Sequence, residues 1–282
     1  MIILGEMQRI VGFFLIKALL RMIDLIISLI AFQGTAIMVS LPTNYSIDQA
    51  HLNWDEQTYD FVKIDSNQMA ILIGVDLDQA PGIYNVPIEI LIDSHPHIGE
   101  LVLEVKKWDF PTTELTVEPK YVQLSSENQA RANLEANEIR ALYARSSSQS
   151  NWRESFIIPL EGIDQGSNFG HRRVFNNEPR APHSGADLAA STGTPILASN
   201  GGRVILAKDL FFSGNAVFID HGAGIFTTYL HLSAIYTKEG DVVEKGQVIG
   251  NVGATGRVTG PHLHWGARIK NTRVDPFTLV SR

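Results

Sequence analysis

The sequence contains no cysteine, which excludes disulfides, cysteine-ligated zinc and thiol catalysis. Any bound metal ion must therefore be held by histidine and carboxylate side chains. Positive charge is also in the minority, since 23 Lys and Arg stand against 30 Asp and Glu, for a formal net charge of −7. Because nucleic-acid phosphates are bound by clustered Lys and Arg, we expect no nucleic-acid partner.

The sequence also lacks an uninterrupted apolar run long enough to cross a bilayer. Residues 10–32 are mostly apolar but include Lys17, Arg21 and Asp24, and the uncharged stretch 25–32 is much shorter than the ~20 residues that a membrane helix needs. Its length suits a signal-peptide core with a positive flank. We predict a signal peptide or a membrane anchor, which places the rest outside the cytoplasm, in the periplasm. The alternative is a soluble amphipathic helix.

The 282 residues correspond to about two domains, because one domain usually has roughly 100–150 residues. The first half reads as short strands, such as 70–77, 83–92 and 101–108, separated by turn signals. This pattern is typical of a small β-sandwich. Within it, His95 and His97 could share a metal ion. They lie in a polar sequence without an obvious third ligand, so we favour a surface turn.

A helix is predicted between the two halves. Ser126 and Gln129 have the spacing of a capping box, and apolar residues then recur at helical spacing up to Tyr143. The polar stretch 146–151 follows as a linker. The helix either connects two domains or lies over a substrate groove.

The remainder is rich in glycine and short β segments, such as 203–207, 216–220, 224–230 and 248–252. We predict a mainly β protein whose C-terminal domain is antiparallel. The predicted division is 1–32 for the signal peptide or anchor, 33–123 for the β-sandwich-like domain, 124–150 for the helix and linker, and 151–282 for the C-terminal domain.

Histidines concentrate in this C-terminal half in three local patterns. His183 and Asp187 could converge on one ion if the chain turns at Gly185. His262 and His264 would project from the same face of a strand, because alternate residues share a face. His231 ends an apolar strand and would be an ordinary structural histidine without the other two patterns.

Together these residues match the needs of hydrolysis at zinc. A catalytic zinc site keeps three protein ligands and one open position for water. The ion lowers the pKa of that water to about 7 and polarises the scissile carbonyl, and a nearby histidine can transfer the proton. The spacing alone does not say which histidine has which role.

Residues 170–275 strongly resemble the lysostaphin/LytM-type family of zinc endopeptidases. The similar stretches occur in the family order. They are 169–173 (FGHRR), 183–188 (HSGADL), 193–195 (GTP), 217–222 (VFIDHG), 229–232 (YLHL), 246–250 (GQVIG) and 253–265 (GATGRVTGPHLHW).

This resemblance implies the roles of five residues. His183, Asp187 and His264 would bind one zinc ion, while His231 and His262 would activate the water and stabilise the tetrahedral oxyanion. It places three further residues outside the metal site. We expect His171 to be solvated or to line the groove, and His221 and Asp275 to support turns.

The resemblance also implies the substrate, which is the peptide stems of bacterial peptidoglycan. Residues 73–84 resemble the small β domain that precedes the peptidase in murein endopeptidases of Gram-negative bacteria. That favours cleavage between D-alanine and diaminopimelate. The alternatives are a catalytically silent LytM-type module that binds the cell wall or activates an amidase, and a latent enzyme whose groove is covered. The sequence does not indicate an oligomeric state.

Overall fold

The computed structural model describes residues 25–42, 47–65, 68–118, 123–145, 150, 152, 154–164, 166 and 168–280. Residues 1–24 of the predicted signal segment therefore lie outside the described residues. Most of the predicted linker, namely 146–149 and 151, lies outside them too. Among the described residues the protein is mainly β with a single α-helix, as predicted.

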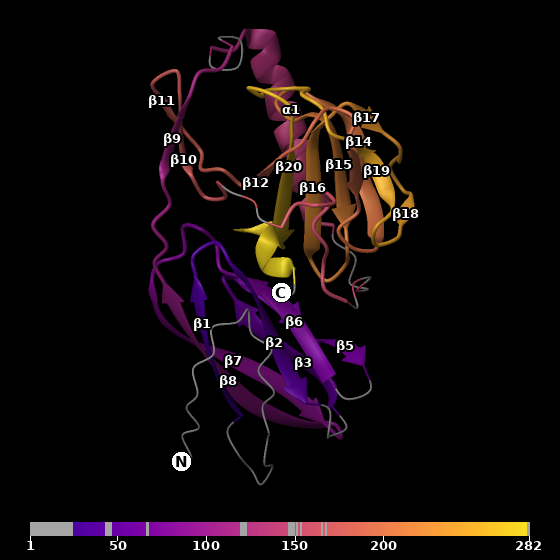
Figure 1. Cartoon of the computed structure of the whole chain (residues 1–282). Helices are drawn as coiled ribbons and strands as arrows, with labels where there is room; N and C mark the ends of the chain where they lie inside the picture. Colours follow the sequence, from indigo (N-terminus) through magenta and orange to yellow (C-terminus); the bar gives the residue numbers. More distant parts are fainter. Residues whose placement is uncertain are drawn as a thin grey trace.

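The N-terminal region consists of two sheets that pack face to face around one apolar core (Figure 1). The first has the order β1-β8-β7-β3-β4, and the second has the order β2-β6-β5. Their strands are β1 (Ile26–Phe32), β2 (Ala36–Pro42), β3 (Ile47–Trp54), β4 (Gln57–Asp60), β5 (Val62–Asp65), β6 (Gln68–Gly74), β7 (Gly82–Ile92) and β8 (His95–Lys106). Strand β8 alternates buried and partly exposed residues from Gly99 onward, which is the period-two pattern of a strand with one face in the core.

Residues 25–32, predicted to be the apolar core of a signal peptide or anchor, belong to the folded N-terminal region in the structure, and the signal peptide or anchor over 1–32 stays a prediction. They form β1, which pairs in parallel with β8 from Ile26 opposite Glu100 to Phe32 opposite Lys106. Ile27 and Ala31 are buried whereas Ile26 and Ile30 are more than half exposed, so the run is an alternating strand. Within the described part of the chain, no helix is both long and apolar enough to span a membrane.

The His95 and His97 pair lies on the surface, as predicted, but in a strand. The tight turn precedes it at Asp93 and Ser94, whose φ angles of 47° and 64° fit a two-residue hairpin loop. His95 then begins β8 opposite Ile92. Both histidines are exposed, and among the described residues neither belongs to a group of three potential metal ligands.

The C-terminal region is built on a large antiparallel sheet, as predicted. Its order is β12-β20-β16-β15-β14-β18, with β21 paired to β20, and a smaller sheet β13-β19-β17 covers its inner face. The elements are β12 (Gly185–Ala189), β13 (Pro195–Leu197), β14 (Gly202–Leu210), β15 (Gly214–Asp220), β16 (Ile225–Leu232), β17 (Ala234–Ile235), β18 (Val242–Val243), β19 (Val248–Asn251), β20 (His262–Ile269), β21 (Thr272–Val274) and the 3-10 helix η2 (Pro276–Leu279). Trp265 and Tyr229 are the largest side chains buried in the core between the two sheets.

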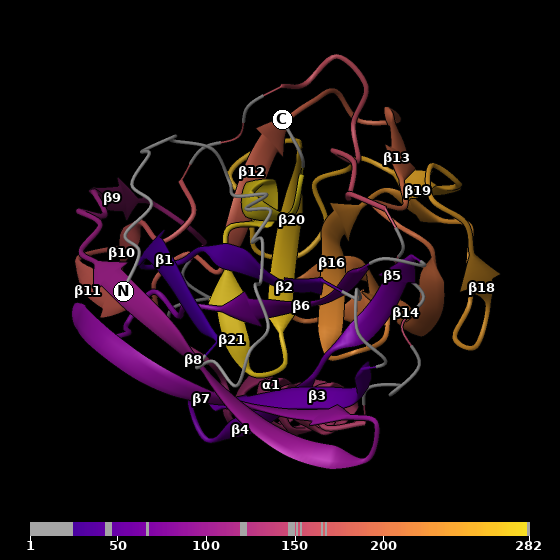
Figure 2. The same ribbon diagram turned by 90° about the horizontal axis from the view of Figure 1, so that it is seen from below.

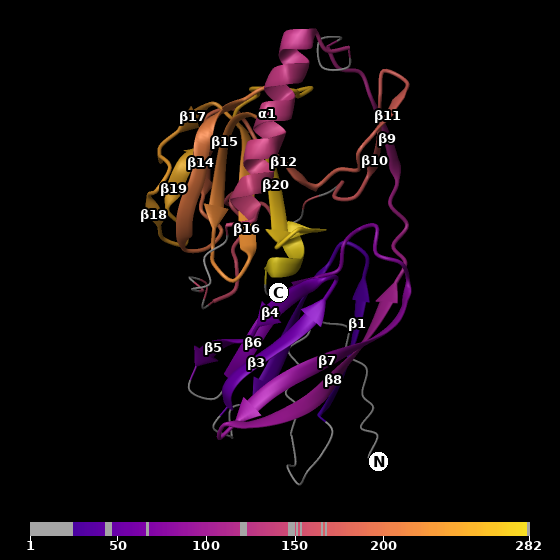
Figure 3. The same ribbon diagram turned by 180° about the vertical axis from the view of Figure 1, so that it is seen from behind.

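The single α-helix, α1 (Ser126–Tyr143), packs on the outer face of the large sheet (Figure 3). Its N-cap is Ser125 rather than Ser126, because the Ser125 side chain accepts a hydrogen bond from the Asn128 amide. Tyr143 stacks on Phe218 and contacts Phe226 edge-on, whereas Leu134 is 71% exposed. The helix therefore lies against the sheet through one stripe only.

A small sheet joins the two halves. Strand β9 (Thr112–Leu115) pairs in parallel with β10 (Arg172–Phe175), which pairs with β11 (Glu178–Arg180). This pairing crosses the predicted domain boundary near residue 150, and the division into domains stays a prediction. Figure 1 shows the β9–β11 sheet as an arm beside the large sheet.

The halves also share an apolar core, because the N-terminal core continues into Ile225, Ile269 and Val274 of the large sheet. Strand β6 lies against β20 and β21 there (Figure 2). An ion pair lies at the edge of this contact. Arg273 of β21 reaches Asp76 Oδ1 at 2.7 Å and Asp78 Oδ2 at 2.9 Å. Burial opposes ionisation of Asp76, but its hydrogen bonds with Arg273 prevail and lower the pKa of that carboxyl.

We expect the Arg273–Asp76 pair to couple the stability of the two halves. Arg273→Ala should lower the free energy of unfolding by about 1.5–3 kcal/mol, because it leaves a half-buried carboxylate without its charged partner. A double-mutant cycle with Asp76→Ala, measured by urea denaturation, gives the coupling energy. The exposed pair Lys208–Glu138 serves as the control, and there we expect a coupling below about 1 kcal/mol. Equal coupling in both cycles would contradict the prediction.

Candidate metal centre and active site

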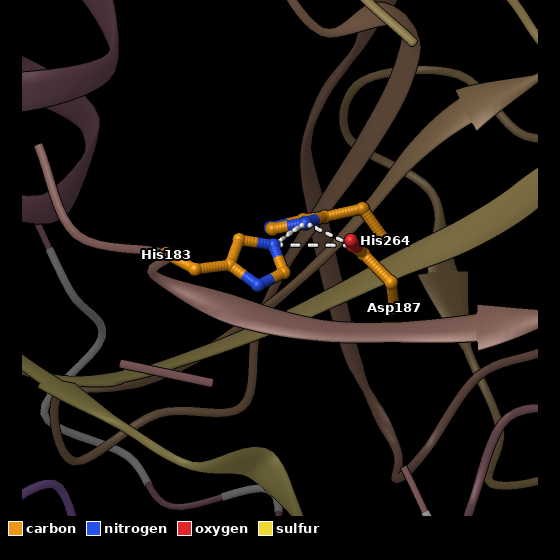
Figure 4. Close-up of side chains that lie close together, drawn as sticks. All are labelled: His183, Asp187 and His264. Atoms are coloured by element: carbon orange, nitrogen blue, oxygen red, sulfur yellow. Dashed lines mark hydrogen bonds and ion pairs between the residues drawn. The ribbon is translucent and has the colours of Figure 1, made fainter. Parts of the chain in front are cut away.

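Two side chains that are close in the sequence, His183 and Asp187, meet the distant His264 at the edge of the large sheet. His183 Nε2 lies 2.8 Å from His264 Nδ1 and 3.1 Å from Asp187 Oδ1. His264 Nδ1 lies 3.0 Å from the same Asp187 oxygen. Figure 4 shows both rings and the carboxylate pointing at one another. These residues form a group of three potential metal ligands, as the sequence predicts.

The pairing of β12 with β20 brings two of the three together. Asp187 lies directly opposite His264, and Ala189 lies opposite His262. Leu263 between the two histidines is fully buried in the inner core, so both imidazoles project from the outer face. The prediction that residues 262 and 264 share a face is confirmed.

Gly185 has a different role from the predicted one. The chain does not turn there, because Gly185 is the first residue of β12 and lies opposite Gly266 of β20. A Cβ atom at Gly185 would lie 2.6 Å from His264 Nε2 and 2.6 Å from the Trp265 carbonyl oxygen. Glycine is therefore required for space beside the His264 ring.

The donor set fits a divalent cation. His183 Nδ1 lies 2.9 Å from the Asn168 carbonyl oxygen, which can only accept, so Nδ1 carries the proton and Nε2 presents a lone pair. Asp187 Oδ1 is also an acceptor. If His264 Nδ1 carries a proton, that proton can be shared between His183 Nε2 and Asp187 Oδ1. If a cation takes the place of the proton, it meets three acceptor atoms. Nitrogen and carboxylate oxygen ligands both suit zinc.

The second oxygen of Asp187 is held by residues that the sequence analysis missed. Asn168 Nδ2 donates to Asp187 Oδ2 at 3.0 Å, and the Arg173 guanidinium lies 3.4 Å from the same oxygen. Burial raises the pKa of Asp187, but the neighbouring imidazoles of His183 and His264 outweigh it and hold the pKa below its usual range. Asp187 is therefore a carboxylate with Oδ1 directed at the two histidines.

His231 and His262 complete the site on the same side of the sheet. The His231 ring centroid lies 5.0 Å from that of His262 and 6.1 Å from that of His264. His262 Nε2 lies 3.6 Å from Asp187 Oδ1. The structure thus brings together all five residues for which the sequence predicts a role in the site.

The position of His231 depends on a β-bulge. Strand β16 pairs with β15 through Tyr229 opposite Val217 and Leu232 opposite Asn215, so β16 has one extra residue here. His231 has a φ of 69°, in the left-handed region that few non-glycine residues adopt. Its Nδ1 donates to the Thr255 carbonyl at 2.9 Å, which leaves Nε2 with the lone pair.

Burial keeps His183 and His231 neutral. Desolvation lowers the pKa of His183 to about 4, although its contact with Asp187 acts in the opposite direction. Desolvation, aided by the proximity of the His264 and His262 imidazoles, lowers the pKa of His231 to about 3. A neutral imidazole can bind a metal ion or accept a proton, so both residues have the protonation state that such a site needs.

Helix α1 lies on the same face of the sheet as these residues. Leu230 of β16 lies opposite His264 of β20. Its side chain packs against the same apolar cluster as Leu142 and Tyr143 of the helix. Tyr143 also lies under the Arg268 guanidinium, four residues along β20 from His264. The helix therefore runs beside the site, while the β9–β11 arm contributes Arg173 from the other side. That helix α1 restricts access of a substrate to the groove stays a prediction.

The other three residues singled out from the sequence lie outside the cluster. His171 Nδ1 forms a hydrogen bond of 2.7 Å with Thr113 Oγ1. His221 is fully buried and contacts the Gly201 carbonyl through Nδ1 and Thr227 Oγ1 through Nε2. Asp275 caps η2 by accepting from the Phe277 amide. The predicted turn roles of His221 and Asp275 agree with these contacts.

Comparisons with known proteins identify the family. The model of peptidase family M23 matches residues 181–276. A crystal structure from Pseudomonas aeruginosa assigned to peptidase M23 is 30% identical, with a TM-score of 0.68, and the alignment covers 89% of this chain and 95% of that one. The chain belongs to peptidase family M23. The predicted family resemblance is therefore confirmed.

Curated relatives match part of this M23 chain. Peptidoglycan DD-endopeptidase ShyA of Vibrio cholerae is 49% identical over 100 residues, or 35% of this chain and 23% of the relative. DD-carboxypeptidase/endopeptidase Mpg of Neisseria meningitidis is 48% identical over 124 residues, or 44% of this chain and 29% of the relative. The M23 chain thus spans about a quarter of the length of each of these relatives.

Gly185→Ala should weaken metal binding, because the new methyl group would displace the His264 ring. We expect an affinity roughly 10–100-fold lower, as for other changes beside a metal ligand. Competition with a zinc chelator measures it. Gly260→Ala is the matched control, since a Cβ there meets nothing within 4 Å. Equal affinities for the two variants would show that the space at Gly185 is unimportant.

His221 should make the fold sensitive to acid. Burial lowers its pKa from 6.5 to about 4, so the unfolded chain binds the proton more readily and stability falls as the pH drops below 6.5. His221→Gln should be less stable than the parent at pH 7.5. Between pH 7.5 and 5.0 it should lose about 2 kcal/mol less than the parent does. Urea denaturation at the two pH values measures this, and equal losses would refute it.

Proposed function

We propose that this protein is a zinc-dependent endopeptidase that hydrolyses the peptide cross-links of bacterial peptidoglycan. The observation that carries the proposal is the convergence of two imidazoles and one carboxylate, with two further imidazoles on the same sheet face. Three ligands leave a coordination position for water, which distinguishes catalytic from structural zinc sites.

His183, Asp187 and His264 would hold one zinc ion. Support comes from the absence of cysteine, from the all-acceptor character of the three converging atoms, and from the M23 family match. A bound zinc ion would supply Lewis-acid polarisation of the scissile carbonyl and a lower pKa for water.

His231 and His262 would perform the proton transfers and stabilise the oxyanion. His231 donates from Nδ1 to the Thr255 carbonyl, so its Nε2 is free to accept a proton from the attacking water and return it to the leaving amine. His262 Nδ1 lies 2.8 Å from the Gly260 carbonyl, which orients the ring in the same way. Its Nε2 side faces the cluster, where it would donate a hydrogen bond to the tetrahedral oxyanion once it carries a proton as well.

The substrate assignment rests on the relatives. The names of ShyA and Mpg state action on peptidoglycan or DD-endopeptidase activity, which supports the predicted bond between D-alanine and diaminopimelate. Such a substrate lies in the cell envelope, so we propose that the chain acts in the periplasm. Its partners would be peptide stems and not nucleic acid, in keeping with the net charge of −7.

The test is digestion of purified peptidoglycan by the zinc-loaded full chain, followed by mass spectrometry of the muropeptides. We expect cross-linked dimers to disappear and chelation to stop the reaction. His264→Ala should abolish activity, whereas His231→Ala and His262→Ala should each reduce kcat by about 10²–10⁴-fold. His95→Ala is the control, because this exposed histidine lies outside the site.

A folded, zinc-loaded chain that leaves cross-linked dimers intact would overturn the enzymatic proposal. If it still binds the wall or activates an amidase, and His231→Ala and His262→Ala keep that property, the silent-module alternative is correct. The muropeptide masses would also identify the bond, since a cut elsewhere than after D-alanine changes the products.

A further inference from the structure

We propose that Asn168 is the positioning residue that sets the orientation of both His183 and Asp187 for the metal ion. The proposal rests on the proposed metal site, and it assigns a role to a side chain that is neither a ligand nor a catalytic group. Asn168 contacts two of the three proposed ligands, which lie on either side of Gly185 in the sequence.

Three hydrogen bonds connect Asn168 to these ligands. Its backbone carbonyl accepts from His183 Nδ1 at 2.9 Å, which fixes Nε2 as the lone-pair nitrogen. Its side-chain oxygen accepts from the Asp187 amide at 3.1 Å. Its side-chain nitrogen donates to Asp187 Oδ2 at 3.0 Å, which turns Oδ1 toward the histidines. One residue therefore fixes the tautomer of one ligand and the rotation of another.

The backbone of Asn168 makes this arrangement possible. Its φ is 71°, in the left-handed region that asparagine tolerates better than most residues. This conformation lets the carbonyl and the side chain of one residue reach His183 and Asp187 together. Aspartate would present only acceptors to Asp187 Oδ2, and glycine would keep only the carbonyl contact.

The N-terminal region holds this residue in place. Residues 110–115 run along the segment that follows Asn168. The Phe110 ring lies against Phe169 with centroids 6.3 Å apart, and a Cβ at Gly170 would lie 2.2 Å from Phe110. The Arg172 amide donates to the Pro111 carbonyl at 2.9 Å, where the β9–β10 pairing begins.

Asn176 provides a matched control on the same arm. It also has a left-handed φ, of 50°, and its side chain also forms two hydrogen bonds, one with the amide and one with the carbonyl of Val117. These contacts hold the arm to the N-terminal region and do not involve the proposed ligands. A structural effect common to both residues can therefore be separated from an effect on the metal.

The experiment compares Asn168→Gly with Asn176→Gly in the full chain. Glycine accepts a left-handed φ without strain, so each variant loses side-chain hydrogen bonds while the backbone conformation is kept. Competition with a chelator gives the zinc dissociation constant, and circular dichroism of the metal-free proteins reports the fold and Tm. We expect zinc affinity to fall about 10–100-fold for Asn168→Gly and less than about twofold for Asn176→Gly, although both lower Tm.

A folded Asn168→Gly variant that binds zinc within about twofold of the parent would overturn the proposal. So would an equal loss of affinity in both variants, because it would show a general loosening of the arm. A parent chain that binds zinc but leaves peptidoglycan intact would refute the proposed activity and not the role of Asn168. A parent chain that does not bind zinc would refute both.

Discussion

The site depends on the antiparallel pairing of β12 with β20, which places a carboxylate directly across from an imidazole. That register puts Asp187 opposite His264, and the chain before β12 brings His183 to the same point. Three acceptor atoms about 3 Å apart are an unfavourable arrangement unless a proton or a cation lies between them. A slip of one residue in this register would move His262 and His264 into the apolar core.

Residues whose role follows from side-chain chemistry and strand periodicity could be predicted from the sequence. The period of two in His262-Leu263-His264 was sufficient to place both rings on one face. Local patterns also singled out His183, Asp187 and His231, and the family resemblance supplied the role of each. Asn168 and Thr255 could not be found in this way. Each accepts a hydrogen bond from a histidine Nδ1 through its backbone carbonyl. Because every residue type has this carbonyl, the contact does not restrict which residue occupies the position. The left-handed φ of Asn168 and its two side-chain hydrogen bonds with Asp187 do favour asparagine, but nothing in the sequence indicates that these groups meet.

Local features that the sequence analysis did not foresee have physical reasons as well. Residues 25–32 were interpreted by the length of their apolar run, but the alternating burial of Ile27 and Ala31 is the signature of a strand. Gly185 suggested a turn, whereas its purpose is to leave room for an imidazole on the neighbouring strand. The division near residue 150 stays a prediction, and the pairing of β9 with β10 and the shared core, which connect the two halves, were not foreseen. Such long-range contacts leave no local pattern in the sequence.

The left-handed backbone at His231 has a consequence for how the molecule can evolve. An L-residue with a side chain pays about 1–2 kcal/mol to adopt this conformation, and glycine would adopt it freely. Selection for rigidity alone would therefore replace this histidine, whereas the proton transfer proposed for it would retain it. Under that proposal stability and activity compete at the bulge, so heat-tolerant variants that keep the histidine must gain their stability elsewhere in the sheet.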